Sequence, residues 1–290
     1  MFTIANTQTQ YLTYRLENLE TQTALEVVPE RGGIITQWQV QGQPILYLDG
    51  ERFRQPELSV RGGIPILFPI CGNLPNNTYT HAGQSYSLKQ HGFARDLPWQ
   101  VVDTQAGLES ASLTLRLVSN AMTRSLYPFD FELDFTYRLT PTELVIDQSY
   151  RNRSAEAMPF SAGFHPYFQV TDKSQLQFDL PATELQDQKS TLTQAFAGQF
   201  DFAQPEIDVA MKELSRQVST VIDPSQGRRL TLAASSDFSV LVFWTLQDKA
   251  FYCLEPWTAG RNALNTGDRL LLLPPEGVME MSMSLAIAPL

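Results

Sequence analysis

The chain holds three histidines, and two of them lie in segments rich in aromatic residues and proline. His165 lies in GFHPYF and His91 lies in QHGFARDLPW, while Glu255 lies in CLEPW, directly after a strand predicted at residues 250–254. An imidazole and a carboxylate can both exchange protons with a substrate near neutral pH. His165 and Glu255 are therefore candidates for a general acid and a general base.

Each of these residues also has a purely structural interpretation. His165 could be a buried histidine bonded to a backbone carbonyl, and His91 could cap a turn. Glu255 could be a surface carboxylate at a strand end. Arg61, in RGGIPILFP, and Arg95, in QHGFARDLPW, could each pair with a surface acid. The presence of an acid and a base on separate strands nevertheless favours proton transfer across a bound substrate.

The segments around these residues are apolar and rigid. Residues 61–73, RGGIPILFPICGN, contain paired glycines and two prolines, which prevent a regular central strand. Aromatic residues and prolines recur around His91, His165 and Glu255. Rigid apolar walls with a few placed polar groups are typical of a small-molecule site, and aromatic rings suit the C–H faces of a sugar.

Short strands must position these side chains. Residues 113–118 and 131–139 alternate apolar and polar side chains, which is the period of a half-buried strand. A Thr-Pro-Thr turn follows, and residues 144–150 resume the alternation, so a β-hairpin is predicted. Further strands are predicted at residues 24–28, 33–40, 101–102, 176–180, 229–233, 239–244, 250–254 and 279–288.

This pattern predicts an all-β fold, a large antiparallel β-sandwich. The chain shows no internal repeat, no low-complexity tract and no linker rich in Gly, Ser or Pro, so a single domain is expected over residues 1–290. Long helical periods are missing, and the one short helix predicted spans residues 206–214.

Composition narrows the function classes. The formal charge of −10 and the pI of about 4.8 disfavour nucleic acid and anionic membranes as partners, because phosphate binding depends on a basic surface. Cys71 and Cys253 have no metal-ligand spacing, and we expect two buried or half-buried thiols and no metal. No signal peptide or membrane span is visible, so a cytoplasmic protein, a monomer or a weak dimer, is expected.

Taken in order, RGGIPILFP, QHGFARDLPW, GFHPYF and CLEPW resemble the motifs of the aldose 1-epimerase (galactose mutarotase-like) superfamily. The similarity runs from about Glu26 to the C-terminus and is nearest to the branch of the hexose-6-phosphate mutarotases. It implies a single large sandwich with an open cleft on one sheet, no cofactor, and a sugar or sugar phosphate as the small-molecule partner.

The resemblance also implies a role for each site residue. Glu255 occupies the position of the base that takes the proton of the C1 hydroxyl, and His165 that of the acid that protonates the ring oxygen. Phe164, Pro166 and Tyr167 would fix the imidazole. Substrate-binding positions are Arg61, His91, Arg95 and Asp208. We expect the pKa of both catalytic groups to rise, Glu255 through burial and His165 beside a carboxylate.

The substrate is left open between a free and a phosphorylated aldose. Arg61 and Arg95 match arginines that form part of a phosphate clamp in the phosphate-specific members, and guanidinium groups suit phosphate oxygens. Arg95 could instead bond the loop at residues 96–99 or a nearby acid. The segment at residues 71–79 also differs from the aromatic-rich continuation of those members.

Three functions are compatible with the motifs. The predicted one is a mutarotase that interconverts the α and β anomers of a hexose or hexose phosphate. The alternative is a non-catalytic carbohydrate-binding module, which would not need an acid–base pair. A glycoside hydrolase or lyase is a weaker third interpretation, because glycoside hydrolysis generally uses two carboxylates.

Overall fold

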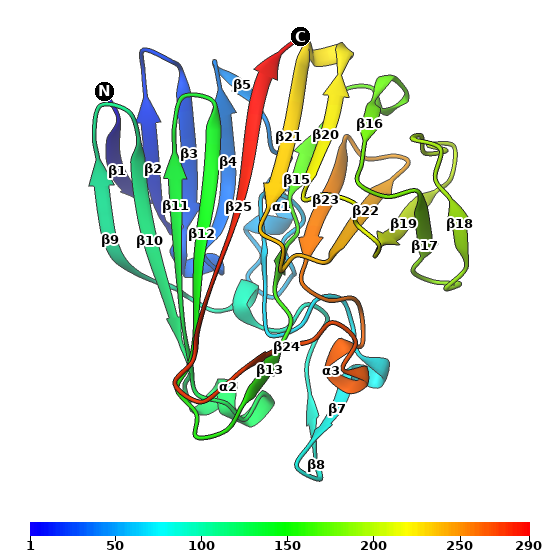
Figure 1. Cartoon of the computed structure of the whole chain (residues 1–290). Coiled ribbons are helices and arrows are strands. Elements are labelled where there is room, and N and C mark those ends of the chain that lie inside the picture. Colours follow the sequence, from blue (N-terminus) through cyan, green and yellow to red (C-terminus); the bar gives the residue numbers. More distant parts are fainter.

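The computed structural model describes all 290 residues and consists mainly of antiparallel strands (Figure 1). The expected all-β antiparallel architecture is confirmed. The N-terminal sheet has the order β1-β2-β3-β4-β5. Its strands are β1 (Thr3–Gln8), β2 (Leu12–Asn18), β3 (Thr23–Val28), β4 (Ile34–Val40) and β5 (Gln43–Pro44).

A second sheet has the order β16-β20-β21-β25-β12-β11-β10-β9. Along β11 the side chains of Phe131, Leu133, Phe135 and Tyr137 are buried and alternate with more exposed ones, as predicted. The hydroxyl of Tyr137 donates to the carbonyl of Gly33 at 2.8 Å, which ties this sheet to the N-terminal one. The strands of the second sheet are β9 (Gln100–Ala106), β10 (Ala111–Val118), β11 (Phe131–Leu139), β12 (Glu143–Asn152), β16 (Gln177–Asp179), β20 (Val218–Asp223), β21 (Arg228–Ala234) and β25 (Val278–Pro289).

A third sheet carries the functional side chains and has the order β18-β17-β19-β22-β23-β14-β6, with β15 also paired to β23. On β22, Leu241 and Phe243 face the main core, whereas Val242 and Trp244 face the opposite side. The strands are β6 (Ile66–Leu67), β14 (Gly163–Phe164), β15 (Tyr167–Gln169), β17 (Glu184–Asp187), β18 (Thr193–Ala195), β19 (Glu206–Met211), β22 (Val240–Leu246) and β23 (Phe251–Trp257).

Small elements close the end of the molecule that lies at the bottom of Figure 1. Two-stranded ribbons form from β7 (Thr78–His81) with β8 (Gln84–Ser87), and from β13 (Met158–Phe160) with β24 (Leu271–Leu273). The helices are short: α1 (Gly50–Phe53), α2 (Ala121–Leu126) and α3 (Ala263–Thr266). None of the helices has the length and apolar composition needed to cross a membrane.

A cluster of 58 buried apolar residues runs from Phe2 to Ile287 and fills the space between the sheets. Phe68 belongs to this cluster and packs its ring against Phe93, Phe131 and Phe160 at centroid distances of 5.0–6.1 Å. Aromatic pairs at such distances add to the stability gained from burial alone. Both cysteines are buried free thiols, as expected.

The helix predicted at residues 206–214 is wrong, because Glu206–Met211 is strand β19. Ile207, Val209 and Met211 face the main core, while Asp208 and Ala210 are buried on the other face. A strand buried on both faces shows no alternation of apolar and exposed residues, which is why its period could not be recognised. Each predicted strand overlaps an observed one, but many observed strands were not predicted, among them β1, β2, β17 and β20.

Candidate active site

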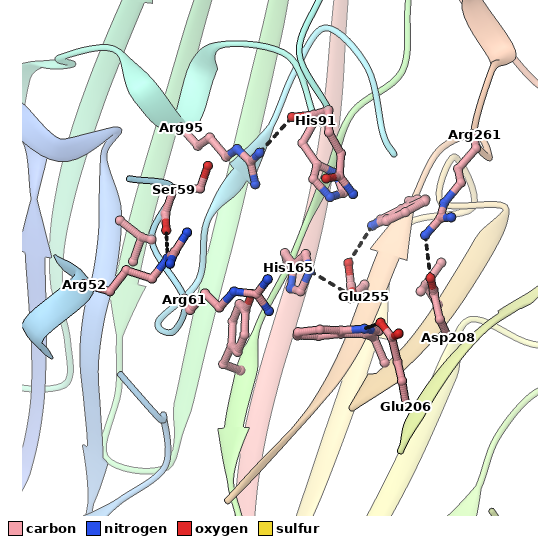
Figure 2. Close-up of a pocket in the computed structure, with 16 residues that line it drawn as sticks. Arg52, Ser59, Arg61, His91, Arg95, His165, Glu206, Asp208, Glu255 and Arg261 are labelled. Carbon is pink, nitrogen blue, oxygen red and sulfur yellow. Dashed lines mark hydrogen bonds and ion pairs between the residues drawn. The ribbon is translucent and has the colours of Figure 1, made fainter. Parts of the chain in front are cut away.

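The four motif segments meet in one pocket of about 330 Å³ on the third sheet (Figure 2). All six residues predicted to form the site line it, and their roles remain predictions. Several other residues of the pocket wall were not predicted from the sequence, among them a third and a fourth arginine. The predicted residues are Arg61, His91, Arg95, His165, Asp208 and Glu255, and the additional ones include Arg52, Ser59, Glu206, Trp244, Trp257 and Arg261.

His165 and Glu255 form a buried pair at the centre of the pocket. The Nε2 atom of His165 lies 3.3 Å from Oε1 of Glu255. Glu255 lies inside β23 rather than after its end, because the strand continues through Pro256 to Trp257. Along this edge β15 pairs with residues 251–253 and β14 with Trp257, so the stretch between them is unpaired. That gap accommodates the missing N–H of Pro256 and places His165 opposite Glu255.

Aromatic rings hold the imidazole of His165. Tyr167 stacks on it at a centroid distance of 4.7 Å, as expected, and Trp244 meets it edge to face at 5.7 Å. Phe164, which we expected to contribute, packs in the main core against Phe135 instead. Strand alternation explains the difference, because neighbouring residues on an extended segment point to opposite faces.

The pKa of Glu255 shifts in the expected direction, but the pKa of His165 does not. Burial, with a smaller effect of Arg95, lowers the pKa of His165 to about 3. Burial, followed by the nearby charge of Asp208, raises the pKa of Glu255 well above its ordinary value. The expected rise for His165 is therefore wrong, because desolvation disfavours the charged ring and the positive charges of Arg95 and Arg61 act in the same direction. The Nδ1 atom of His165 is buried without a partner, which agrees with a neutral ring.

A second residue of the CLEPW motif, Trp257, forms a hydrogen bond with the carboxylate of Glu255. The indole Nε1 of Trp257 donates to Oε2 of Glu255 at 3.2 Å. Side chains two apart on a strand share a face, so the spacing of Glu255 and Trp257 brings them together. This bond leaves Oε1 directed toward His165 and fixes the orientation of the carboxyl group.

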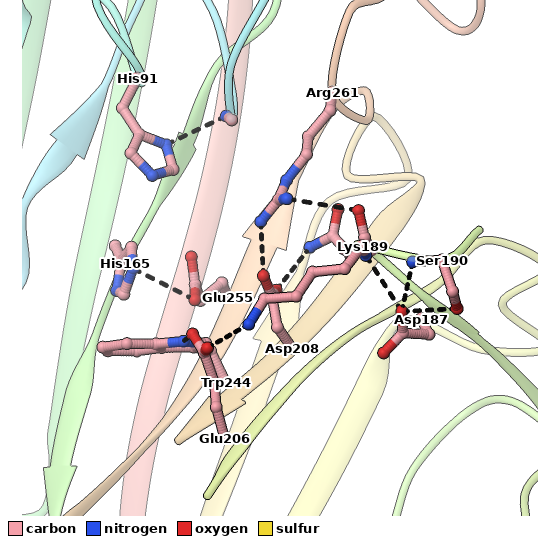
Figure 3. A network of polar contacts seen from close by, with 12 residues as sticks. His91, His165, Asp187, Lys189, Ser190, Glu206, Asp208, Trp244, Glu255 and Arg261 are labelled. Atoms are coloured by element: carbon pink, nitrogen blue, oxygen red, sulfur yellow. Dashed lines mark hydrogen bonds and ion pairs between the residues drawn. The ribbon is translucent and has the colours of Figure 1, made fainter. Parts of the chain in front are cut away.

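His91 presents a defined hydrogen-bonding state. Its Nδ1 accepts from the backbone N–H of Gly72 at 3.0 Å, and burial, with the charge of Arg95, lowers its pKa well below the usual value. A neutral ring with Nδ1 as acceptor carries its proton on Nε2. Figure 3 shows this second nitrogen directed away from the Gly72 bond and into the site. His91 therefore has an N–H donor available inside the pocket.

Three guanidinium groups in the pocket, those of Arg52, Arg61 and Arg95, have no carboxylate partner. Arg61 lies over the ring of Trp244, with its Cζ 5.3 Å from the centroid. Arg95 donates from Nη2 to the carbonyl of Gln90 at 2.8 Å, and its buried Nε has no partner. It therefore bonds neither the loop at residues 96–99 nor an acid. Arg52, which sequence analysis missed, lies beside them and donates from Nε to the carbonyl of Ser59 at 2.6 Å.

Asp208 lies within strand β19, 8% exposed, and not at a helix N-terminus. It accepts a bond of 2.7 Å from Nη2 of Arg261 and one of 3.1 Å from Nε2 of Gln188. Neither partner was predicted, because each comes from a loop distant in sequence. The carboxylate is held rigidly at the edge of the pocket.

The positions of the pocket residues depend on glycines in the RGG and HGF segments. Gly63 has φ +64°, and a Cβ there would lie 2.2 Å from the carbonyl oxygen of Ile35. Gly92, next to His91, has φ +70°, and a Cβ there would lie 2.2 Å from the carbonyl oxygen of Phe68. Only glycine permits these close approaches of two backbones.

We expect Gly63→Ala to lower the free energy of unfolding by about 2–4 kcal/mol, measured by urea denaturation, because positive φ and a backbone clash act together. Gly83→Ala is the matched control. Gly83 has φ +78° but nothing within 4 Å of an added Cβ, so a loss of about 1 kcal/mol is expected. Equal losses in the two variants would contradict the close approach at Gly63.

Comparison with known proteins decides the family. The sequence model of the family described as aldose 1-epimerase matches residues 14–271. The chain belongs to the aldose 1-epimerase family. The resemblance inferred from the four motifs is confirmed.

This aldose 1-epimerase family member is also similar in sequence to individual known proteins. The solved structure of the Slr1438 protein of Synechocystis sp. PCC 6803 is 45% identical, covers 100% of both chains and has a TM-score of 0.95. A Cenchrus ciliaris protein named "Putative glucose-6-phosphate 1-epimerase" is 31% identical over 157 residues, which are 51% of this chain but only 44% of that protein. Protein LacX of Lactococcus lactis subsp. lactis is 24% identical over 289 residues, covering 90% of this chain and 89% of its own length.

The fold brings together one group of potential metal ligands that could not be recognised from residue spacing in the sequence. Atoms of His165, Cys253 and Glu255 lie within 4.8 Å of one another. Burial raises the pKa of the Cys253 thiol well above its usual value, so the thiolate that binds metals is disfavoured. The unpaired guanidinium groups of Arg61 and Arg95 also oppose a cation in this pocket.

For this member of the aldose 1-epimerase family we therefore expect activity that does not depend on a metal. Incubation with EDTA followed by desalting should leave the anomer-exchange rate within twofold of the untreated protein. A loss that Zn²⁺ or Mg²⁺ restores would contradict this expectation and would point to the group around Cys253.

Proposed function

We propose that this protein interconverts the α and β anomers of a phosphorylated hexose by acid–base ring opening. The observation that carries the proposal is the buried His165–Glu255 pair, 3.3 Å apart, in a pocket that also holds three guanidinium groups without carboxylate partners. A non-catalytic carbohydrate-binding protein would not need such a pair, because burying two ionisable groups costs free energy.

The chemistry requires one proton shared by the pair. Glu255 takes the proton of the C1 hydroxyl, and Nε2 of His165 gives a proton to the ring oxygen as the bond from C1 to that oxygen breaks. Rotation about the C1–C2 bond and the reverse transfers close the ring on the other face. The proton must start on His165, although burial favours the uncharged pair. A hydroxyl donating to the carboxylate and a ring oxygen accepting from the imidazolium favour the required form.

The remaining contacts suit a sugar. Nε2 of His91 is available as a donor. The carboxylate of Asp208, which is held by Arg261 and Gln188, can accept a further hydrogen bond from a sugar hydroxyl. Trp244 and Trp257 provide apolar surface in the pocket. A few placed polar groups against aromatic walls are typical of specific small-ligand sites.

The charge distribution favours a phosphorylated substrate. Arg61 and Arg95 face the pocket without a carboxylate, and an anion would compensate their charge. The departure at residues 71–79 from the phosphate-specific pattern carries little weight, because none of these residues lines the pocket. The name of the Cenchrus ciliaris relative, "Putative glucose-6-phosphate 1-epimerase", agrees with this substrate class.

The test is anomer exchange measured by NMR or polarimetry on glucose, galactose and glucose 6-phosphate. We expect exchange above the spontaneous rate, fastest for glucose 6-phosphate. Saturable binding of a sugar without any acceleration of exchange would overturn the catalytic proposal and would favour a binding protein.

A further inference from the structure

Trp244 joins the arginine side of the pocket to its catalytic side. In the sheet it stands opposite Asp208 on one neighbouring strand and Cys253 on the other. Arg61 lies over the indole ring. The same ring contacts His165 edge to face, with an interplanar angle of 77°, and Figure 3 shows the two rings side by side. The plane of this one ring therefore affects two groups of the proposed reaction.

A carboxylate that sequence analysis did not single out fixes this ring. The indole Nε1 of Trp244 donates to Oε1 of Glu206 at 2.8 Å, while the other oxygen of Glu206 accepts from Lys189. Burial by itself would raise the pKa of Glu206, but the bonds from Lys189 and Trp244 outweigh it and hold the pKa below the usual value. The acceptor of the indole therefore stays ionised at neutral pH.

The turn that carries Lys189 is itself ordered. Oδ1 of Asp187 accepts from the backbone N–H of Lys189 at 3.1 Å and from that of Ser190 at 2.6 Å. These bonds form a compact turn between β17 and β18 and direct Lys189 toward Glu206, as Figure 3 shows. A continuous chain of contacts thus runs from this turn through Glu206 and Trp244 to His165.

We propose that Glu206 is a positioning residue for anomer exchange, which fixes the plane of the Trp244 indole and through it the places of His165 and Arg61. The inference rests on the proposed function. It assigns to Glu206 no contact with the reacting atoms, because its two oxygens are engaged by Nε1 of Trp244 and by Lys189.

The expected effects separate this role from direct binding of a sugar hydroxyl. We expect Glu206→Ala to lower kcat about tenfold with KM nearly unchanged, since misplaced catalytic groups slow the chemical step. Glu206→Gln should retain at least a third of the activity, because its amide oxygen can still accept from Nε1 of Trp244. Glu213→Ala, which removes an exposed carboxylate paired with Arg269, is the matched control and should leave the rate unchanged.

A double-mutant cycle gives the decisive comparison. Trp244→Phe removes the indole donor, so adding Glu206→Ala to it should cost less than a further twofold. If Glu206→Ala costs the same tenfold in both backgrounds, or raises KM alone, Glu206 acts on the substrate directly and the proposal is overturned.

A spectroscopic measurement keeps the inference testable without activity. The indole ¹H–¹⁵N resonance of Trp244, identified by its loss in Trp244→Phe, should shift in Glu206→Ala and shift less in Glu206→Gln. An unchanged resonance in Glu206→Ala would show that the bond is absent and would overturn the positioning role. If the wild type exchanges no sugar while this resonance shifts as expected, it is the proposed function that fails.

Discussion

Replacing His165 by alanine or Glu255 by glutamine is expected to slow anomer exchange by about 10²–10⁴-fold, the usual contribution of a general acid or base. Glu255→Gln is the sharper of the two variants. It keeps the size of the side chain and an acceptor for Nε1 of Trp257, which donates to the native carboxylate at 3.2 Å, but it cannot take up a proton. NMR exchange spectroscopy on glucose 6-phosphate measures the rate directly.

The third histidine provides the control for this experiment. His81 lies in β7, outside the pocket, with its Nε2 3.4 Å from Glu156. His81→Gln should exchange anomers at the wild-type rate. Circular dichroism and thermal unfolding should establish that all three variants remain folded. A rate within threefold of wild type in either His165→Ala or Glu255→Gln would refute the assignment of that residue.

The second large effect concerns substrate choice. We expect Arg95→Ala to lower kcat/KM for glucose 6-phosphate by about 10–100-fold and to change the value for glucose little, because a hydrogen bond to a charged group contributes roughly 1.5–3 kcal/mol. Arg95 is half-buried, and its guanidinium has one protein acceptor, the carbonyl of Gln90. Steady-state kinetics on both sugars, in wild type and variant, give the comparison.

Arg138→Ala is the matched control for the loss of a positive charge. Arg138 pairs with Asp147 at 2.7 Å on the second sheet, away from the pocket, so both kcat/KM values should stay unchanged. Equal kcat/KM for glucose and glucose 6-phosphate in the wild type would exclude a phosphate clamp. The pair of His165 and Glu255 would then serve a free aldose.

The sequence predicted the features that depend on local pattern. Residues 131–139 alternate so regularly that β11 could be placed to the residue. His165 and Glu255 could be singled out because their motifs are short and contiguous. Asp208 was selected correctly for the pocket but placed on a helix, since residues 206–211 are buried on both faces and show no strand period.

What escaped prediction depends on contacts between distant segments. Nothing near Glu206 in the sequence indicates that it bonds Trp244, 38 residues away, and Arg261 reaches Asp208 from a loop 53 residues later. The fall in the pKa of His165 could not be foreseen either, because it follows mainly from burial by the folded chain rather than from any neighbour in the sequence. The contacts of Glu206 and Asp208 depend on which strands and loops become neighbours in the fold, and the local amino-acid composition does not determine this.

The four cations that line the pocket, Arg52, Arg61, Arg95 and Arg261, are all arginines, and no lysine lines it. The proposed ring opening releases an aldehyde at C1, and an aldehyde condenses readily with a neutral amine to form a Schiff base. A lysine beside the open-chain sugar would lose its proton in this partly desolvated space and could trap the intermediate, whereas a guanidinium stays protonated. If the proposed function holds, we expect the choice of arginine to let the pocket attract an anionic sugar and release it after every turnover without becoming glycated.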